Sequence, residues 1–295
     1  MKTQMTKSIG SLLVAGLLTL PSLVQAQPTA HYVPGSEGIK AATLPPPGFW
    51  LRDYNSFYYA NQVNDAHGNK IGAANPEVFI YANVPRLLWI TDVQVLGGYL
   101  GVDALLPLEY IYVKGVDHTF GIGDAFFEGS WSWHLTQWDL SLAAGAWAPT
   151  GDFSMTAPTR AGVGYWTEML TAGATWYPDQ AKRWALSVLN RYEFSQEQRE
   201  THITPGQAYT VEGGLSYGVT KTVDVGAIGY YQQQVTTDSG TGASHERDRV
   251  AGIGPEISVF FPSAMLGVSV RYAYEFMAES RLQGHTATLT ITKKL

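Results

Sequence analysis

The sequence has no cysteine, few charges and no long apolar run outside its N-terminus, and each absence excludes a class of protein. Without cysteine the chain has no disulfide framework, no thiolate metal site and no cysteine nucleophile. Charged residues make up 15% of the 295 residues and the net charge is -6, which argues against a nucleic-acid-binding protein, because such proteins need a basic surface. After the N-terminus, no run reaches the roughly 18 apolar residues of a membrane helix. We therefore expect no nucleic-acid partner and no helical membrane span.

The first 26 residues have the pattern of a secretory signal peptide. Lys2 and Lys7 precede an apolar run over residues 9–24, and Ala26 ends a small-residue cleavage motif. The run is too short and its exit too polar for a stable membrane helix. We expect residues 1–26 to be removed and the protein to be exported.

Residues 27–47 form a separate, proline-rich N-terminal segment. Three consecutive prolines, at 45–47, fix the backbone and lack amide donors, so this stretch forms neither a helix nor a ladder strand. We expect an ordered loop or a plug, followed by a barrel domain over residues 48–295.

The remainder of the chain alternates strand-like segments of about ten residues with turns that are alternately short and long. The short connections are 91–92, 134–137, 178–182, 218–221 and 262–263, and the long ones are 61–75, 113–119, 148–162, 195–206, 235–247 and 277–283. This pattern predicts an all-β fold, a transmembrane antiparallel β-barrel of about twelve strands with short periplasmic turns and long external loops.

Aromatic residues gather at both ends of these segments, as the two interfaces of a membrane require. Those near short turns are Trp89, Trp133, Trp138, Trp176, Tyr177, Trp184, Tyr217, Phe260 and Phe261. Those beside long loops are Tyr112, Phe120, Trp147, Tyr165, Tyr192, Phe194, Tyr209, Tyr231, Tyr274 and Phe276. A soluble β-sandwich would share the two-residue period, but it would have no reason for two aromatic belts.

Alternation within the strands separates a lipid face from a lumen face. In residues 266–276 the apolar residues from Leu266 to Phe276 share one parity, and Arg271 and Glu275 share the other. The same parity gives a mostly acidic lumen with a few arginines: Asp103, Glu109, Asp124, Glu128, Arg191, Glu193, Glu212, Asp224, Glu256, Arg271 and Glu275. These groups either pair to hold a narrow barrel together or line a permeation path, and both roles are compatible.

Several blocks resemble an outer-membrane transporter family named for the meta-pathway of phenol degradation. They are residues 38–54, with the sequence Gly-Ile-Lys-Ala-Ala-Thr-Leu-Pro-Pro-Pro-Gly-Phe-Trp-Leu-Arg-Asp-Tyr, and residues 81–86, 120–124, 147–152, 203–206, 248–250 and 254–256. The resemblance implies an outer-membrane barrel of a Gram-negative bacterium that takes up aromatic or other hydrophobic compounds. It also implies contact with outer-membrane lipid and with the barrel-assembly machinery, although the chain ends in Leu295 where such barrels usually end in an aromatic residue.

Signals for an enzyme are weak. The string from Gly214 to Gly218 matches a nucleophile elbow around Ser216, but it ends a strand before a hairpin turn rather than a helix. The histidines of the long loops show no metal-ligand spacing. We therefore expect no catalytic activity, no cofactor and no metal. Two alternatives to a channel stay open: a barrel enzyme such as an esterase or protease, and a sealed structural or adhesive barrel.

Two sets of residues are the candidates for a functional site. The expected pore-lining or substrate-path residues are Arg52, Asp53, Tyr54, Arg86, Asp124, Glu128, Arg191, Glu256 and Arg271. The expected plug or gate residues are Leu44, Pro45, Pro46, Pro47, Phe49 and Trp50. If the triple-proline stretch gates the lumen, deleting residues 44–47 should raise the leak of small polar solutes.

Overall fold

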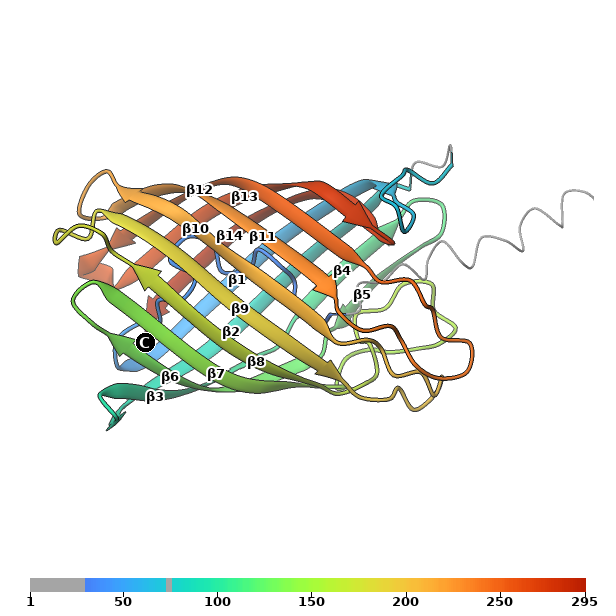
Figure 1. Cartoon of the computed structure of the whole chain (residues 1–295), viewed down its shortest axis with the longest axis horizontal. Helices are drawn as coiled ribbons and strands as arrows, with labels where there is room; N and C mark the ends of the chain where they lie inside the picture. The colour runs from blue at the N-terminus through green and yellow to red at the C-terminus, as the bar shows by residue number, and fades with distance from the viewer. Residues whose placement is uncertain (1–29, 73–75) are drawn as a thin grey trace, which may run out of the picture.

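The fold is seen in a computed structural model that describes residues 30–72 and 76–295 (Figure 1). The expected signal peptide, and the first three residues of the N-terminal segment after it, lie outside the described residues. Within the described ranges, no helix has the length and apolar character of a membrane span.

Antiparallel strands close into one barrel, because β1 pairs with β14 on one side and with β2 on the other. The strands are β1 (Gly48–Val63), β2 (Val78–Val95), β3 (Gly98–Leu105), β4 (Leu108–Val113), β5 (Asp117–Ile122), β6 (Ala125–His134), β7 (Trp138–Ala148), β8 (Thr167–Trp176), β9 (Trp184–Ser195), β10 (Ala208–Gly218), β11 (Val223–Gln234), β12 (Arg249–Phe261), β13 (Leu266–Glu279) and β14 (Leu282–Lys294).

Twelve strand positions make the ring, because two of them are each split into two segments. β3 and β4 pair with successive stretches of β2, and β6 and β5 pair in turn with β3 and β4. The split falls at Leu106 and Pro107, since proline has no amide hydrogen for the ladder. The amide of Gly123 donates to the carbonyl of Pro107 at 2.8 Å across the break. The prediction of about twelve strands is confirmed.

Long connections gather at one end of the barrel, called here the loop end, and short ones at the other, the turn end (Figure 1). Three predicted connections were wrong. Residues 91–92 lie inside β2, and the turn falls at Leu96 and Gly97, which have φ of 47° and 77°; a tight hairpin needs such positive φ values. Residues 113–119 and 277–283 contain only short turns, because their strands run on as hairpins.

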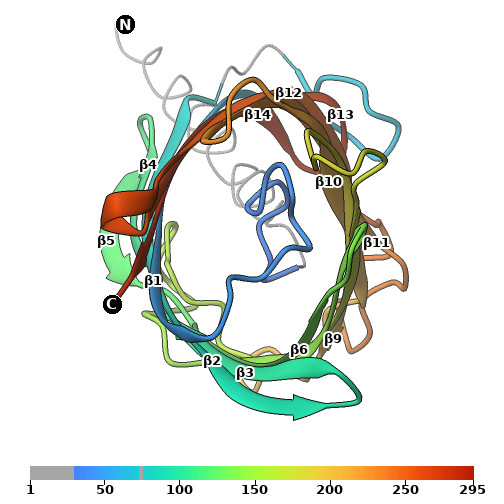
Figure 2. The ribbon, with the colours of Figure 1, turned by 90° about the vertical axis from the view of Figure 1, so that its left-hand side faces the viewer.

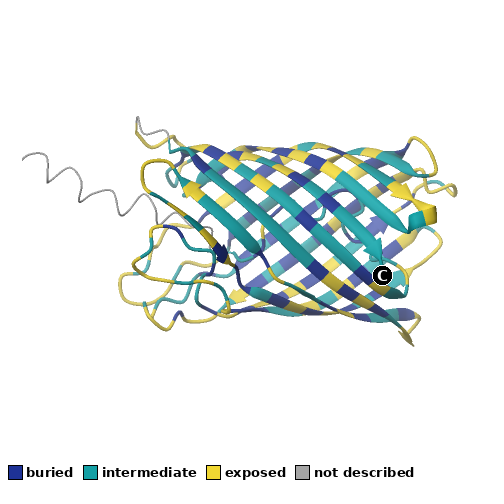
Figure 3. Ribbon diagram, turned by 180° about the vertical axis from the view of Figure 1, so that it is seen from behind, coloured by how far each residue is buried: buried dark blue, intermediate teal, exposed yellow. Residues whose placement is uncertain are grey.

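Side chains alternate between an exposed outer face and a buried lumen face, as the alternating colours of Figure 3 show. On β13, Val270 and Phe276 are exposed whereas Arg271 and Glu275 are buried, as predicted. Trp138, Trp176 and Trp184 are exposed near the turn end. Trp147, Tyr165 and Tyr177, expected in the aromatic belts, are instead buried, which corrects that prediction.

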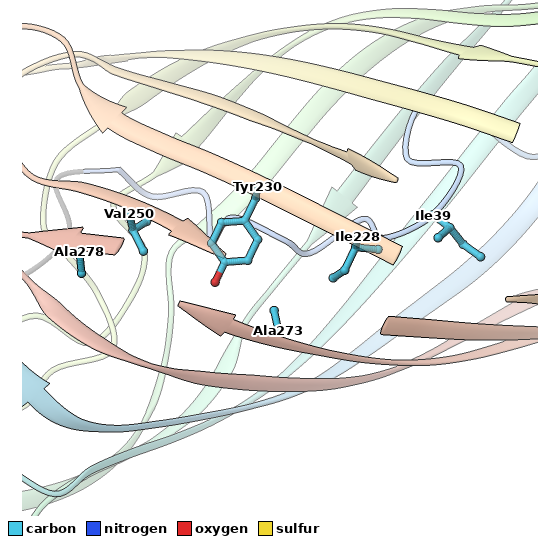
Figure 4. Close-up of a cluster of buried hydrophobic side chains, with 6 residues drawn as sticks. All are labelled: Ile39, Ile228, Tyr230, Val250, Ala273 and Ala278. Carbon is cyan, nitrogen blue, oxygen red and sulfur yellow. The ribbon is translucent and has the colours of Figure 1, made fainter. Parts of the chain in front are cut away.

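The N-terminal segment contributes to the apolar packing inside the barrel. Ile39 packs in one cluster with Ile228, Tyr230, Val250, Ala273 and Ala278, whose side chains come from β11, β12 and β13 (Figure 4). The segment therefore has an apolar anchor on the inner wall.

Candidate functional site

Residues 30–43 run through the lumen from the loop end to the turn end, and residues 44–47 lead on to β1. Figure 2, seen along the barrel from the turn end, shows this segment inside the ring of strands. At the loop end, His31 lies 2.7 Å from Thr167 Oγ1 and 3.1 Å from Asp124 Oδ2. At the turn end, the Thr43 hydroxyl donates to Asp139 at 3.0 Å. The segment thus spans the length of the lumen.

Glu37 is the charged centre of this segment. Its carboxylate accepts hydrogen bonds from Arg52 at 2.8 Å, from Arg86 at 3.1 Å and from the Tyr54 hydroxyl at 3.0 Å. Arg191 lies 3.6 Å away. Burial by itself would raise the pKa of Glu37, but the guanidiniums of Arg52, Arg86 and Arg191 outweigh it and lower the pKa to about 2.

The docking of the segment should depend on pH through Glu37. Because its pKa lies near 2 in the docked segment and near 4.5 when free, the carboxylate favours docking above about pH 4.5. That contribution is lost as the pH falls from 4.5 toward 2. We expect the conductance of the protein in planar bilayers to stay low from pH 8 to 5 and to rise below pH 4. In Glu37→Gln the rise in conductance below pH 4 should be absent. An equal rise in the parent and in Glu37→Gln would contradict the role of Glu37.

Carboxylates on the barrel wall bind the backbone of the segment as well as its side chains. Glu193 accepts the amide of Tyr32 at 3.1 Å, Glu212 that of Gly35 at 2.9 Å, and Glu256 that of Ile39 at 2.8 Å. Arg271 donates to the carbonyl oxygen of Gly35 at 3.1 Å. Hydrogen bonds to charged groups are stronger than neutral ones, so these contacts hold one defined backbone path.

A polar cavity of about 220 Å³ remains beside the segment, toward the turn end. It lies between Glu37 and Lys40 of the segment and the inner faces of β12, β13 and β14. Lys40 lies at the edge of this cavity, and its Nζ forms an ion pair with Asp224 Oδ2 at 2.7 Å. The remaining space is therefore lined mainly by charged and hydroxyl groups.

Eight of the nine expected pore-lining residues face the lumen: Arg52, Tyr54, Arg86, Asp124, Glu128, Arg191, Glu256 and Arg271. Each contacts the N-terminal segment except Glu128, which binds Arg86 at 2.9 Å. The structure therefore brings them together as the wall around one segment.

Asp53 was predicted to line the pore, and the structure corrects this prediction. It lies on the outer face of β1, where Asn55 and Asn83 donate to its carboxylate at 2.8 Å each. Arg52 and Tyr54, its neighbours in sequence, point inward, and strand alternation turns the residue between them outward.

The expected plug residues are also partly misplaced. Phe49 is 55% exposed and stacks on Trp89 at the outer surface, so it is not in the lumen. Trp50 is buried and donates to the carbonyl of Pro46 at 2.9 Å. Residues 44–47 connect the lumen segment to β1 at the turn end, and the lumen itself is crossed by the residues before them.

Sequence reasoning missed two residues of the segment that make several polar contacts to the wall, His31 and Glu37. Glu37 is the only acidic residue between Ala30 and Pro47, which was a usable signal opposite a lumen containing arginines. Ser216 is buried within β10, facing the lumen, in a strand rather than a strand–turn–helix.

The barrel is similar to solved bacterial barrels. A COG4313 outer membrane channel from Pseudomonas putida F1 matches with a TM-score of 0.78 at 15% identity, over 90% of this chain and 100% of that one. The β domain of the Bordetella autotransporter BrkA matches with a TM-score of 0.51 at 13% identity, over 85% and 100%. The translocator domain of NalP from Neisseria meningitidis also gives 0.51, at 10% identity, over 85% and 90%. At these identities the likeness concerns the fold.

No curated protein sequence matches the chain at a significant level. The profile of one protein family, by contrast, matches residues 60–291, which confirms the resemblance seen in the sequence blocks. The chain belongs to the family described as "Putative MetA-pathway of phenol degradation".

Proposed function

We propose that this protein is an outer-membrane channel of a Gram-negative bacterium for small hydrophobic or aromatic compounds, with residues 30–43 as its plug. The observation that carries the proposal is the course of this segment through the whole lumen, held at its ends and at its centre by hydrogen bonds. Wall side chains alone fill barrels of about eight strands, so in this ring of twelve strand positions the lumen is closed by the separate segment.

Membership of a family described by phenol degradation supports an aromatic substrate. The contacts of the segment also support a plug that moves. Apart from the apolar packing of Ile39, Tyr32 and His31, the wall holds the segment through hydrogen bonds and ion pairs, which water can replace. Interactions of this kind exchange for hydration at a net cost of only about 0.5–3 kcal/mol each. Export by the expected signal peptide and contact with outer-membrane lipid are parts of the same proposal.

Solute flux through the refolded protein in liposomes tests this function. Phenol, benzoate and a sugar of equal size are compared, each corrected for leak across protein-free vesicles. We expect phenol to enter fastest relative to its leak. Flux ordered by size alone would make the protein a general porin. No flux, with an intact barrel by circular dichroism, would favour the sealed barrel or the barrel enzyme.

A further inference from the structure

A patch of apolar side chains lies on the inner wall at the loop end, and Tyr32 of the N-terminal segment packs on it. Phe126 of β6, Trp147 of β7, Tyr165 of the loop before β8 and Met169 of β8 form it, and each is at most 8% exposed. We call these four residues the aromatic recess. The ring of Phe126 lies over Gly145, where an added Cβ would come within 2.6 Å of that ring. The sequence thus leaves room at Gly145 for this ring.

The aromatic recess holds a ring contributed by the N-terminal segment. His31 stacks on Trp147 with ring centres 5.5 Å apart and an interplanar angle of 13°, and it meets Tyr165 edge-on at 5.1 Å. The edge of the His31 ring contacts Thr167 Oγ1 and Asp124 Oδ2. A flat ring with a polar edge is therefore what this recess accommodates.

Two polar atoms beside the ring have no hydrogen-bond partner within the described part of the chain. They are the indole nitrogen Nε1 of Trp147 and the oxygen Oε2 of Glu193, both buried. Glu193 uses its other oxygen to accept the amides of His31 and Tyr32. A buried donor or acceptor without a partner costs about 1–3 kcal/mol. A ligand hydroxyl can both donate and accept, so it suits either atom.

The charges beside the polar edge of the His31 ring favour a neutral aromatic ligand over an anionic one. Asp124 and Glu193 are the acidic groups that contact His31. Arg160 lies near Tyr165, but within the described residues no arginine or lysine is hydrogen-bonded or ion-paired to His31. A neutral hydroxyl can donate to either carboxyl group. An aromatic carboxylate would instead meet like charges in a buried place, which is unfavourable.

We propose that the aromatic recess is a binding site for a neutral phenolic ring and that His31 occupies it when no ligand is present. This inference rests on the proposed function and names its substrate site. A phenol that enters displaces His31 and breaks the contacts of the segment to Asp124, Thr167 and Glu193. Ligand binding therefore loosens the loop-end anchor of the plug.

Equilibrium dialysis of phenol and of benzoate at pH 7 against the purified protein in detergent tests this site, with protein-free micelles as the blank. His31→Ala removes the competing ring and should bind phenol at least about fivefold more tightly. Trp147→Phe removes one donor and should bind it roughly three- to tenfold more weakly. Trp176→Phe, on the outer face, is the matched control and should bind as the parent does. Benzoate should bind more weakly than phenol to each protein.

Unchanged phenol affinity in both His31→Ala and Trp147→Phe would overturn the proposal, as would benzoate binding equal to phenol binding. Circular dichroism checks each barrel. If His31→Ala does not fold, His31→Gln keeps a polar side chain without the ring and should also bind phenol more tightly. Binding and flux are separate readings. Phenol flux that persists while binding is insensitive to these variants overturns the recess alone, and phenol binding without flux overturns the channel alone.

Discussion

Gly38→Val is expected to release the N-terminal segment and to raise the ion conductance of the barrel. Gly38 has φ of 71°, a conformation that disfavours a β-branched residue by about 1–2 kcal/mol. Its Cβ would also overlap the carboxylate of Glu256, which accepts the amide of Ile39 and faces Arg271 at 3.8 Å. The backbone strain alone changes the ratio of docked to undocked segments roughly 5- to 30-fold. Single-channel recording in planar bilayers measures the effect.

Gly115→Val is the matched control for this experiment. Gly115 has a similar φ of 72°, in the turn between β4 and β5, and a Cβ there would meet no atom within 4 Å. It carries the same backbone strain away from the lumen, so its conductance should equal that of the parent. A variant that lacks residues 30–43 gives the reference value for the conductance of the open barrel. If that deletion conducts no better than the parent, the segment is not a plug.

Arg86→Met is expected to destabilise the barrel by about 3–5 kcal/mol. Arg86 is 6% exposed and binds Asp103 at 2.8 Å, Glu128 at 2.9 Å and Glu37 at 3.1 Å. Its removal leaves three buried carboxylates without the cation that they share. Urea unfolding of the barrel in detergent, followed by tryptophan fluorescence, measures the loss.

Arg249→Met provides the comparison, because Arg249 pairs with Glu279 while its own side chain is 46% exposed. Exposed pairs contribute about 0–1 kcal/mol, so this variant should unfold close to the parent. Equal losses in the two variants would show that the Arg86 cluster does not hold the wall. Arg86→Met should also raise conductance, since Glu37 loses one of its three cations.

The residues predicted best are those that obey the two-residue period of a strand. Arg271 and Glu275 were placed in the lumen, and Val270 and Phe276 outside, from alternation on β13 alone. Asp53 was misplaced where that period was not applied, in the run from Arg52 to Tyr54. Trp147 was misplaced because its position near a loop fits either an aromatic belt or a lumen wall, and composition does not distinguish the two faces.

The sequence by itself determined the barrel class, the strand number and most of the lumen charges, because each follows from local period and turn chemistry. Only the tertiary structure decided what those charges bind. Glu37 meets Arg191 across 154 positions of sequence and His31 meets Asp124 across 93, so neither contact has a local signature. A segment without regular structure takes its path from the wall around it, and that wall exists only once the barrel has closed.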